Sequence, residues 1–204
     1  MSTETPLPTP YILPSHAAFR RAAAVQQSLR PPATCNSGFV DAAAAVRPSR
    51  LVSGDFYDFL QSEREFHVRL SDTRGMALFY GVMTRDHRLT YCCAGHCQPI
   101  LVDGSQVRRL GAGRAPSDLV DDDVYKKQSL PIAKGDTLVV FSDGALPADR
   151  DDQEFGDARI VDIVTQPAAT AAAIRDRLVN AVTDFTRGSR QRDDMAVLVV
   201  RYLG

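Results

Sequence analysis

A series of short apolar runs, each closed by turn residues, is the feature that most constrains the fold of this chain. Several runs alternate in polarity or are rich in β-branched and aromatic residues, as strands of a sandwich are. They cover 39–46, 54–60, 65–71, 76–83, 88–93, 98–103, 106–110, 124–130 and 136–142. A continuous apolar run at 195–202 predicts a buried final strand.

Helical patterns lie on both sides of this strand-rich part. The alanine-rich segment 16–29 predicts a short helix that ends before Pro31 and Pro32. Apolar side chains recur at helical spacing in 157–165 and 168–186, and Pro167 suits the first turn of the second of these helices. The layout predicts one α+β domain over 15–204, preceded by a disordered, proline-rich arm at 1–14.

Composition excludes several classes of protein. The chain has 204 residues, of which 44% are hydrophobic, so it can build a core of its own. Its net charge of −1 gives no reason to expect binding to nucleic acid or to an anionic membrane surface. The apolar runs are too short to span a bilayer, and the N-terminus is not a signal peptide. We therefore expect a cytoplasmic protein.

The chain contains four cysteines, and their spacing matches neither a zinc site nor a redox motif. We expect them to be small apolar residues in or beside strands. They are Cys35, Cys92, Cys93 and Cys97.

Four aspartates stand where extended runs end or bend. They are Asp55 in Ser53-Gly-Asp-Phe-Tyr-Asp58, Asp72 in Ser71-Asp-Thr-Arg-Gly75, Asp143 in Phe141-Ser-Asp-Gly144, and Asp193 in Arg192-Asp-Asp-Met195. Carboxylates at strand ends can converge on one point, and Mg²⁺ and Mn²⁺ prefer such oxygen ligands. Two adjacent cations activate water for phosphoester hydrolysis. A single Asp-Gly is normally a plain turn, but the ordered set of four is a stronger signal.

From Ala22 to Tyr202 the chain resembles the SpoIIE-type branch of the metal-dependent (PPM) serine/threonine protein phosphatases. Five ordered segments carry this resemblance. They are Val25-Gln-Gln-Ser-Leu-Arg-Pro31, Val52-Ser-Gly-Asp-Phe-Tyr-Asp-Phe59, Leu89-Thr-Tyr-Cys-Cys-Ala-Gly-His96 with Pro99, Gly135-Asp-Thr-Leu-Val-Val-Phe-Ser-Asp-Gly144, and Arg192-Asp-Asp-Met-Ala-Val-Leu-Val-Val200.

The resemblance implies an α-β-β-α sandwich with two Mn²⁺ or Mg²⁺ ions between the edges of two sheets. It also implies that a metal-bridging hydroxide hydrolyses phosphoserine or phosphothreonine. Asp55 and Asp143 would be catalytic. The metal ligands would be Asp55, Asp72 as the bridging ligand, the Thr73 carbonyl, Asp143 and Asp193, with Asp194 beside them or as an alternative ligand. The implied substrate is a phosphorylated STAS-domain protein, an anti-sigma-factor antagonist that controls a stress sigma factor.

Other polar residues have plainer interpretations. Asp58 is more typical of a surface charge than of a ligand, and the acidic run 121–123 is typical of a solvated loop. His96 could act as a general acid because imidazole titrates near neutrality. A histidine beside a glycine turn is more often a hydrogen-bonded structural residue, and we favour that interpretation.

The chain departs from the family after Asp72, where a pair of long helices is missing and one helical layer is therefore reduced. Two hypotheses follow: an active, minimal phosphatase, or a degenerate relative that binds a partner without turnover. The loss should also uncover an apolar sheet face. We expect a homodimer or a partner to cover it, with the 16–29 helix as an alternative. The side chains expected on this face are Phe66, Leu70, Met76, Leu78, Tyr80 and Val82.

Overall fold

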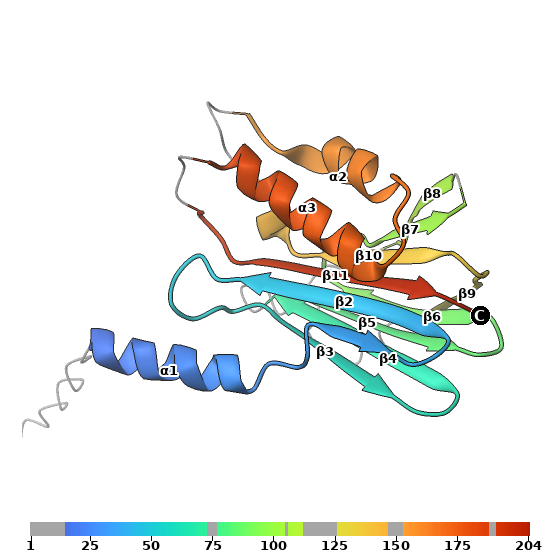
Figure 1. The fold of residues 1–204 in the computed structure, drawn as a ribbon, viewed down its shortest axis with the longest axis horizontal. Helices are drawn as coiled ribbons and strands as arrows, with labels where there is room; N and C mark the ends of the chain where they lie inside the picture. The colour runs from blue at the N-terminus through green and yellow to red at the C-terminus, as the bar shows by residue number, and fades with distance from the viewer. Residues whose placement is uncertain (1–14, 73–76, 105, 112–125, 147–152, 188–190) are drawn as a thin grey trace, which may run out of the picture.

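A computed structural model of the protein describes residues 15–72, 77–104, 106–111, 126–146, 153–187 and 191–204. Two antiparallel sheets lie face to face, and helices cover the outer side of one of them (Figure 1). This arrangement confirms the predicted α+β sandwich. The segment 1–14, expected to be a disordered arm, lies outside the described residues.

Eleven strands are found in the described part of the chain. The first sheet has the order β1 (Thr34–Asn36), β2 (Val40–Arg47), β11 (Met195–Tyr202), β10 (Thr137–Phe141), β7 (Ile100–Asp103) and β8 (Gln106–Arg109). The second sheet has the order β3 (Phe56–Gln61), β4 (Glu65–Asp72), β5 (Ala77–Thr84), β6 (Arg88–Ala94) and β9 (Gln128–Pro131). Nearly all of these strands coincide with a predicted apolar run; the sequence pattern missed only β1.

The α-helices of the described ranges are α1 (His16–Ser28), α2 (Gly156–Val164) and α3 (Ala171–Phe185), and a short 3-10 helix, η2 (Asp143–Ala145), follows β10. The placement of Pro167 in the first turn of the last helix was wrong. α3 begins after Thr170, whose hydroxyl accepts a hydrogen bond from the Ala173 N–H at 3.1 Å and so caps the helix. None of the helices in the described ranges is long and apolar enough to cross a membrane.

The main core lies between the two sheets. Phe66 and Leu70 of β4 and Phe79 of β5 are fully buried there, opposite Leu138 and Leu198 of the first sheet. A second core lies on the other face of the first sheet, where α2 and α3 pack. Its members include Val139, Phe141, Val197 and Val199 from the strands and Ile160, Leu178 and Val182 from the helices.

The outer face of the second sheet carries no helix among the described residues (Figure 1). Leu78 and Tyr80 of β5 point outward and are each 37% exposed, while Val82 is half-buried. The prediction that Phe66 and Leu70 lie on this face was wrong. Both belong to the alternate set of strand positions, which faces the other sheet. Met76 lies outside the described residues.

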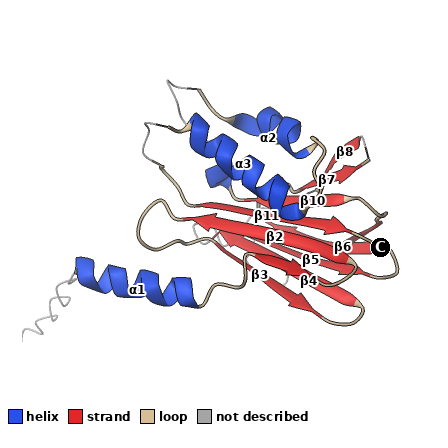
Figure 2. Ribbon diagram, in the orientation of Figure 1, coloured by secondary structure: helices blue, strands red, loops and turns tan. Residues whose placement is uncertain are grey.

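α1 does not cover this face either. It projects beyond the end of the sandwich (Figure 2), and none of its residues is buried. Val25 and Leu29, at and beyond its C-terminal turn, are 57% and 76% exposed. The 16–29 helix therefore does not cover the outer face of the second sheet, which was the alternative expected from the sequence.

Candidate metal centre

Each sheet delivers acids to the same end of the sandwich. Asp55 immediately precedes β3 and Asp72 ends β4, and the pairing of Phe56 with Ser71 sets these two acids side by side in the second sheet. In the first sheet, Asp143 follows β10, and residues 193–194 precede β11. Because β10 and β11 are paired antiparallel through Phe141 and Val197, these acids are also neighbours.

Gly144 allows the two loops of the first sheet to approach each other. A Cβ atom at this position would lie 1.8 Å from the backbone oxygen of Asp194, which no side chain could tolerate. Ser142 joins the same loops, because its N–H donates to the Ala196 carbonyl at 3.0 Å and its hydroxyl accepts from the Ala196 N–H at 2.8 Å. Asp143-Gly144 therefore forms a turn and also lets the two loops pack closely.

Asp194 connects the two sheets. Its carboxylate accepts hydrogen bonds from the backbone N–H groups of Ser49 and Gly54, both at 2.6 Å. Burial alone would raise the pKa of this carboxyl, but the hydrogen bonds from Ser49 and Gly54 outweigh it and hold the pKa below its ordinary value. Asp194 is thus an ionised clamp on the loop that leads to Asp55.

A second clamp on that loop comes from α1. The Gln26 side-chain amide donates to the Ser53 carbonyl at 2.5 Å and accepts from the Ser53 N–H at 2.9 Å. This paired contact resembles one rung of a sheet and fixes the backbone two residues before Asp55. Sequence reasoning assigned no role to Gln26 beyond its place in a family motif.

Asp55 is the most perturbed acid in the site. Its side chain is buried, and burial raises the pKa of its carboxyl to about 7, with a further contribution from three negative charges. A hydrogen bond with Ser142 opposes this rise. The charges that act on Asp55 are those of Asp72, Asp194 and Asp143. Its Oδ2 atom is buried without a hydrogen-bond partner among the described residues.

Asp193 has a different setting from Asp194. Its Oδ1 accepts a hydrogen bond from the Asp194 N–H at 2.8 Å, and its carbonyl accepts one from the Gln191 side chain at 2.7 Å. Of these two adjacent acids, Asp194 is the one whose charge raises the pKa of Asp55. Thr73, whose carbonyl the family resemblance adds to the ligand set, lies outside the described residues.

His96 and Cys97 lie beside the acids. His96 is buried, its Nδ1 is 3.1 Å from the Cys97 carbonyl, and burial lowers the pKa of its imidazole. The Nδ1 contact agrees with a structural role, whereas Nε2 is buried without a hydrogen-bond partner among the described residues. Burial, followed by the charges of Asp143 and Asp72, raises the pKa of the Cys97 thiol to about 11. All four cysteines are free.

Two acidic features do not join the cluster. Asp58 points to the outer face of the second sheet, where its carboxylate pairs with the Arg69 guanidinium at 2.7 Å. The acidic run 121–123 lies outside the described residues.

The cluster fits divalent cations in charge and in donor type. Several carboxyls from two sheets act on one another, and the orphaned Oδ2 of Asp55 is the kind of hard oxygen donor that Mg²⁺ and Mn²⁺ prefer. Within the described ranges, no three His, Cys, Asp or Glu side chains already form a group that could hold an ion. The acids therefore gather without forming a closed set of ligands.

The model of the SpoIIE family (stage II sporulation protein E) matches residues 53–203. The chain belongs to this family. It is thus a member of the SpoIIE branch of the PPM protein phosphatases, as its motifs predicted. A search of curated proteins gives no significant match.

Solved structures share the fold of this SpoIIE-family protein. The SiaA-PP2C domain of Pseudomonas aeruginosa is 17% identical, with a TM-score of 0.75 over 91% of this chain and 96% of that one. The SpoIIE phosphatase domain of Bacillus subtilis, with a fragment of its regulatory domain, is 20% identical. Its TM-score is 0.68 over 79% of this chain and 63% of that one. The catalytic domain of the serine/threonine phosphatase PstP, solved with 2 manganese ions, is 14% identical, with a TM-score of 0.55 over 81% and 99%.

Proposed function

We propose that this chain is an active metal-dependent phosphatase that removes phosphate from serine or threonine on a regulatory protein. The observation that carries the proposal is the convergence of Asp55, Asp72, Asp143 and Asp194, from two sheets, on one end of a SpoIIE-family sandwich. Like charges that converge in a partly buried site are costly, and a bound dication would remove that cost.

The proposed site holds two Mn²⁺ or Mg²⁺ ions. Asp55, Asp72, Asp143 and Asp193 would be side-chain ligands, with the Thr73 carbonyl as a further one and Asp194 as the residue that fixes the Asp55 loop. Bound ions would supply an activated water and neutralise charge on the phosphoryl oxygens. The PstP catalytic domain, which was solved with 2 manganese ions, supports this choice of metal.

The protein's own residues set the position of Asp55. Asp194 holds the Gly54 N–H, Gln26 holds the Ser53 backbone, and Ser142 bonds to the carboxyl itself. These contacts orient Asp55 toward the other acids, while burial keeps its carboxyl out of bulk water. A carboxyl with a pKa of about 7 would lose its proton when a metal ion binds to it.

The decisive experiment is a manganese-dependent assay on p-nitrophenyl phosphate. Wild-type protein should hydrolyse it, and Asp55→Ala and Asp143→Asn should each abolish turnover because each removes an anionic ligand. Manganese binding measured by calorimetry provides a second readout. Normal activity in Asp55→Ala would refute the two-metal site. Binding of manganese without turnover would favour the second hypothesis, a degenerate relative that holds a partner.

The proposed substrate is a phosphorylated STAS-domain protein, as the family resemblance implies. The chain has no glycine-rich nucleotide cradle, which is consistent with a protein substrate. Phosphate release from such a protein, compared with release from ATP, tests this assignment. Rapid hydrolysis of ATP with the phosphoprotein left intact would show that the substrate class is wrong.

Three further expectations remain predictions. They are the homodimer, the location in the cytoplasm and the single domain over 15–204. Light scattering on the full chain would test the first of these.

A further inference from the structure

The segment 95–99 joins the two sheets at the end where the acids gather. It follows β6 of the second sheet and precedes β7 of the first sheet. At the end of β6, Ala94 pairs with Leu78, and the preceding residue of that neighbouring strand, Ala77, pairs with Asp72. Strand alternation turns the Asp72 side chain toward the first sheet, in the same set of positions as the buried residues of β4. The segment therefore crosses between the sheets on the side to which Asp72 points.

His96 of this segment has one ring nitrogen in use and one to spare. The residue is only 4% exposed, and its Nδ1 atom lies 3.1 Å from the Cys97 carbonyl oxygen. A carbonyl oxygen can only accept a hydrogen bond, so Nδ1 carries the ring proton. Burial lowers the pKa of the imidazole, so the ring is neutral at neutral pH and Nε2 holds a lone pair. That Nε2 atom is buried without a hydrogen-bond partner among the described residues.

The Nε2 atom of His96 has a counterpart in the Oδ2 atom of Asp55. Each is a buried atom that can offer a lone pair and that has no partner within the described ranges. The Asp72 carboxylate acts on both groups, because it raises the pKa of Asp55 and opposes the fall in the pKa of His96. A buried acceptor without a donor is costly, and a bound cation would satisfy both atoms.

The neighbouring thiol of Cys97 is not an equivalent donor. The charges of Asp143 and Asp72 both act on it, so the segment lies beside acids of both sheets. Burial, together with these charges, raises the pKa of the thiol to about 11. The thiol therefore stays protonated, whereas a metal ligand has to be the thiolate. Neutral imidazole needs no deprotonation to bind a metal, so His96 is the residue of this segment that suits a cation.

We propose that His96 Nε2 is a nitrogen ligand of the divalent centre and makes the centre prefer Mn²⁺ to Mg²⁺. This inference rests on the proposed function, and it chooses between two ions that the acids alone leave open. Mg²⁺ takes oxygen ligands, whereas imidazole suits transition-metal ions. The hydrogen bond from Nδ1 to the Cys97 carbonyl is the contact that orients metal-binding histidines. The described donors do not form a closed group of three, as expected of carboxylates that repel one another without an ion.

Pulsed EPR of Mn²⁺ bound to the full chain tests this ligation directly. A coordinated imidazole adds a nitrogen hyperfine coupling to the manganese signal, and isotopic labelling of the histidine nitrogens should change that coupling. The chain has 4 histidines of its own, so the protein must carry no histidine tag. We expect the coupling in wild type and its loss in His96→Asn. This readout depends on neither turnover nor a phosphoprotein.

His96→Asn separates the roles of the two ring nitrogens. The asparagine amide can still donate to the Cys97 carbonyl in place of Nδ1–H, but no atom takes the place of Nε2. Its Mn²⁺ affinity should fall about tenfold or more, the least that loss of an outer-shell partner costs, while its Mg²⁺ affinity should change much less. His96→Gln, which brings an amide oxygen near the place of Nε2, should shift the preference toward Mg²⁺. A purely structural His96 would leave the Mn²⁺ affinity of His96→Asn unchanged.

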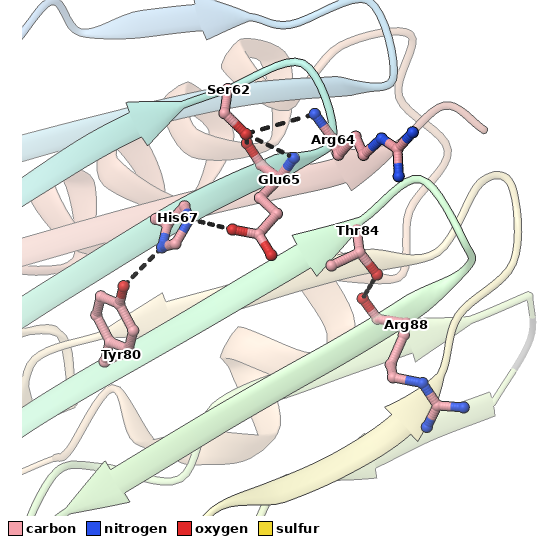
Figure 3. Close-up of polar contacts among 7 residues, drawn as sticks. All are labelled: Ser62, Arg64, Glu65, His67, Tyr80, Thr84 and Arg88. Atoms are coloured by element: carbon pink, nitrogen blue, oxygen red, sulfur yellow. Dashed lines mark hydrogen bonds and ion pairs between the residues drawn. The ribbon is translucent and has the colours of Figure 1, made fainter.

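His67→Asn is the matched control. His67 lies on the outer face of the second sheet, where its Nδ1 is 2.6 Å from the Tyr80 hydroxyl and its Nε2 is 3.1 Å from Glu65 (Figure 3). Both of its ring nitrogens already have partners. His67→Asn should therefore keep both the nitrogen coupling and the ratio of Mn²⁺ to Mg²⁺ affinity at their wild-type values.

The outcomes separate the ligand from the reaction. If wild type binds Mn²⁺ without histidine coupling, or if folded His96→Asn binds Mn²⁺ as tightly as wild type, the inference is wrong. The phosphatase function still stands in that case if p-nitrophenyl phosphate is hydrolysed. Coupling that His96→Asn removes, in a protein that hydrolyses nothing, supports the ligand and contradicts the function. If His96→Asn does not fold, His96→Gln and the labelled wild-type spectrum decide. Wild type that binds no Mn²⁺ would overturn both proposals.

Discussion

The two sheets of this sandwich differ in how many of their faces are covered. In the first sheet, β10 is buried along its whole length and β11 almost so, because one face packs on the second sheet and the other lies under α2 and α3. In the second sheet, β5 alternates between buried and more exposed positions, because within the described structure only its inner face is packed. The polarity pattern of a strand thus records whether one or both of its faces are packed.

The same difference extends to the acids that each sheet contributes. Asp194, from the first sheet, accepts two backbone hydrogen bonds that hold its pKa below the ordinary value, although burial opposes them. Asp55, from the second sheet, has a pKa raised to about 7 by burial and a buried oxygen without a partner in the described structure. The first sheet supplies a fixed framework, and the second supplies the carboxyl that most needs a counter-ion.

The largest expected effect comes from Leu→Ala in α3, compared with Leu→Ala on the outer face of the second sheet. Leu178→Ala in α3 removes a fully buried side chain above the first sheet, and it should lower the free energy of unfolding by ~2–5 kcal/mol. Leu78→Ala on the bare face should change it by less than ~0.5 kcal/mol. Urea denaturation of both variants measures the difference. A comparable loss in both would mean that the second sheet is covered in solution.

The close approach between the loops of the first sheet should give the next largest effect. Gly144→Ala places a methyl group against the Asp194 backbone, so the loops must separate at a cost of ~1–3 kcal/mol and manganese-dependent activity should fall with them. Gly111→Ala is the control, since its Cβ would meet the nearest atom at an ordinary 3.5 Å. Thermal melting and the p-nitrophenyl phosphate assay provide the two readouts. A stable, active Gly144→Ala would contradict this packing.

Strand periodicity was enough to predict most of the elements. It could not identify β1, because Thr34–Asn36 is short and polar and exists through its pairing with β2. It also could not say which set of alternate side chains in β4 faces inward. A period of two defines two faces, and only the packing of the other sheet decides that Phe66 and Leu70 are the buried set.

The acids of the site could be predicted because their motifs are local. Their supports could not, because they join distant parts of the chain through backbone groups that have no sequence signature. Asp194 binds the N–H of Gly54, 140 positions away, and Gln26 binds the backbone of Ser53, 27 positions away. These bonds go to main-chain groups, which no residue pattern marks, although the Ser53 hydroxyl also helps to lower the pKa of Asp194.

The pH dependence of stability should distinguish Asp55 from Asp194. The folded-state pKa of Asp55, about 7, lies above the ordinary 3.8, so its stabilising contribution is fully present below pH 3.8 and is lost as pH rises through about 7. Metal-free protein should therefore melt at a lower temperature at about pH 8 than at about pH 5. Asp55→Asn should remove most of that difference. An unchanged pH dependence in Asp55→Asn would show that another group titrates.

Asp194→Asn is the control for this experiment. Its pKa is lowered, so its contribution is present above 3.8 and lost only as pH falls through the lowered value, outside the window tested. The variant should be less stable than wild type at both pH values, but by a smaller amount at about pH 8, because it also removes one of the charges that raise the pKa of Asp55. Saturating manganese should reduce the pH dependence of the wild type, since a bound dication favours the ionised form of Asp55.

The smallest expected effect concerns the helix caps, and it asks whether α1 belongs to the cooperative fold. Thr170 caps α3, which packs on the first sheet, so Thr170→Ala should lower the free energy of unfolding by ~1 kcal/mol. Ser15 caps α1 in the same way, with its hydroxyl accepting from the Ala18 N–H at 3.2 Å, but no residue of α1 is fully buried, although Gln26 bonds to Ser53. A helix of 13 residues with no buried apolar face is marginal in water, so Ser15→Ala should leave the urea midpoint nearly unchanged. If Ser15→Ala were as costly as Thr170→Ala, the apolar side of α1 would have to be packed in solution in addition to the Gln26–Ser53 contact, and its exposed Val25 and Leu29 would be the first residues to test as that contact.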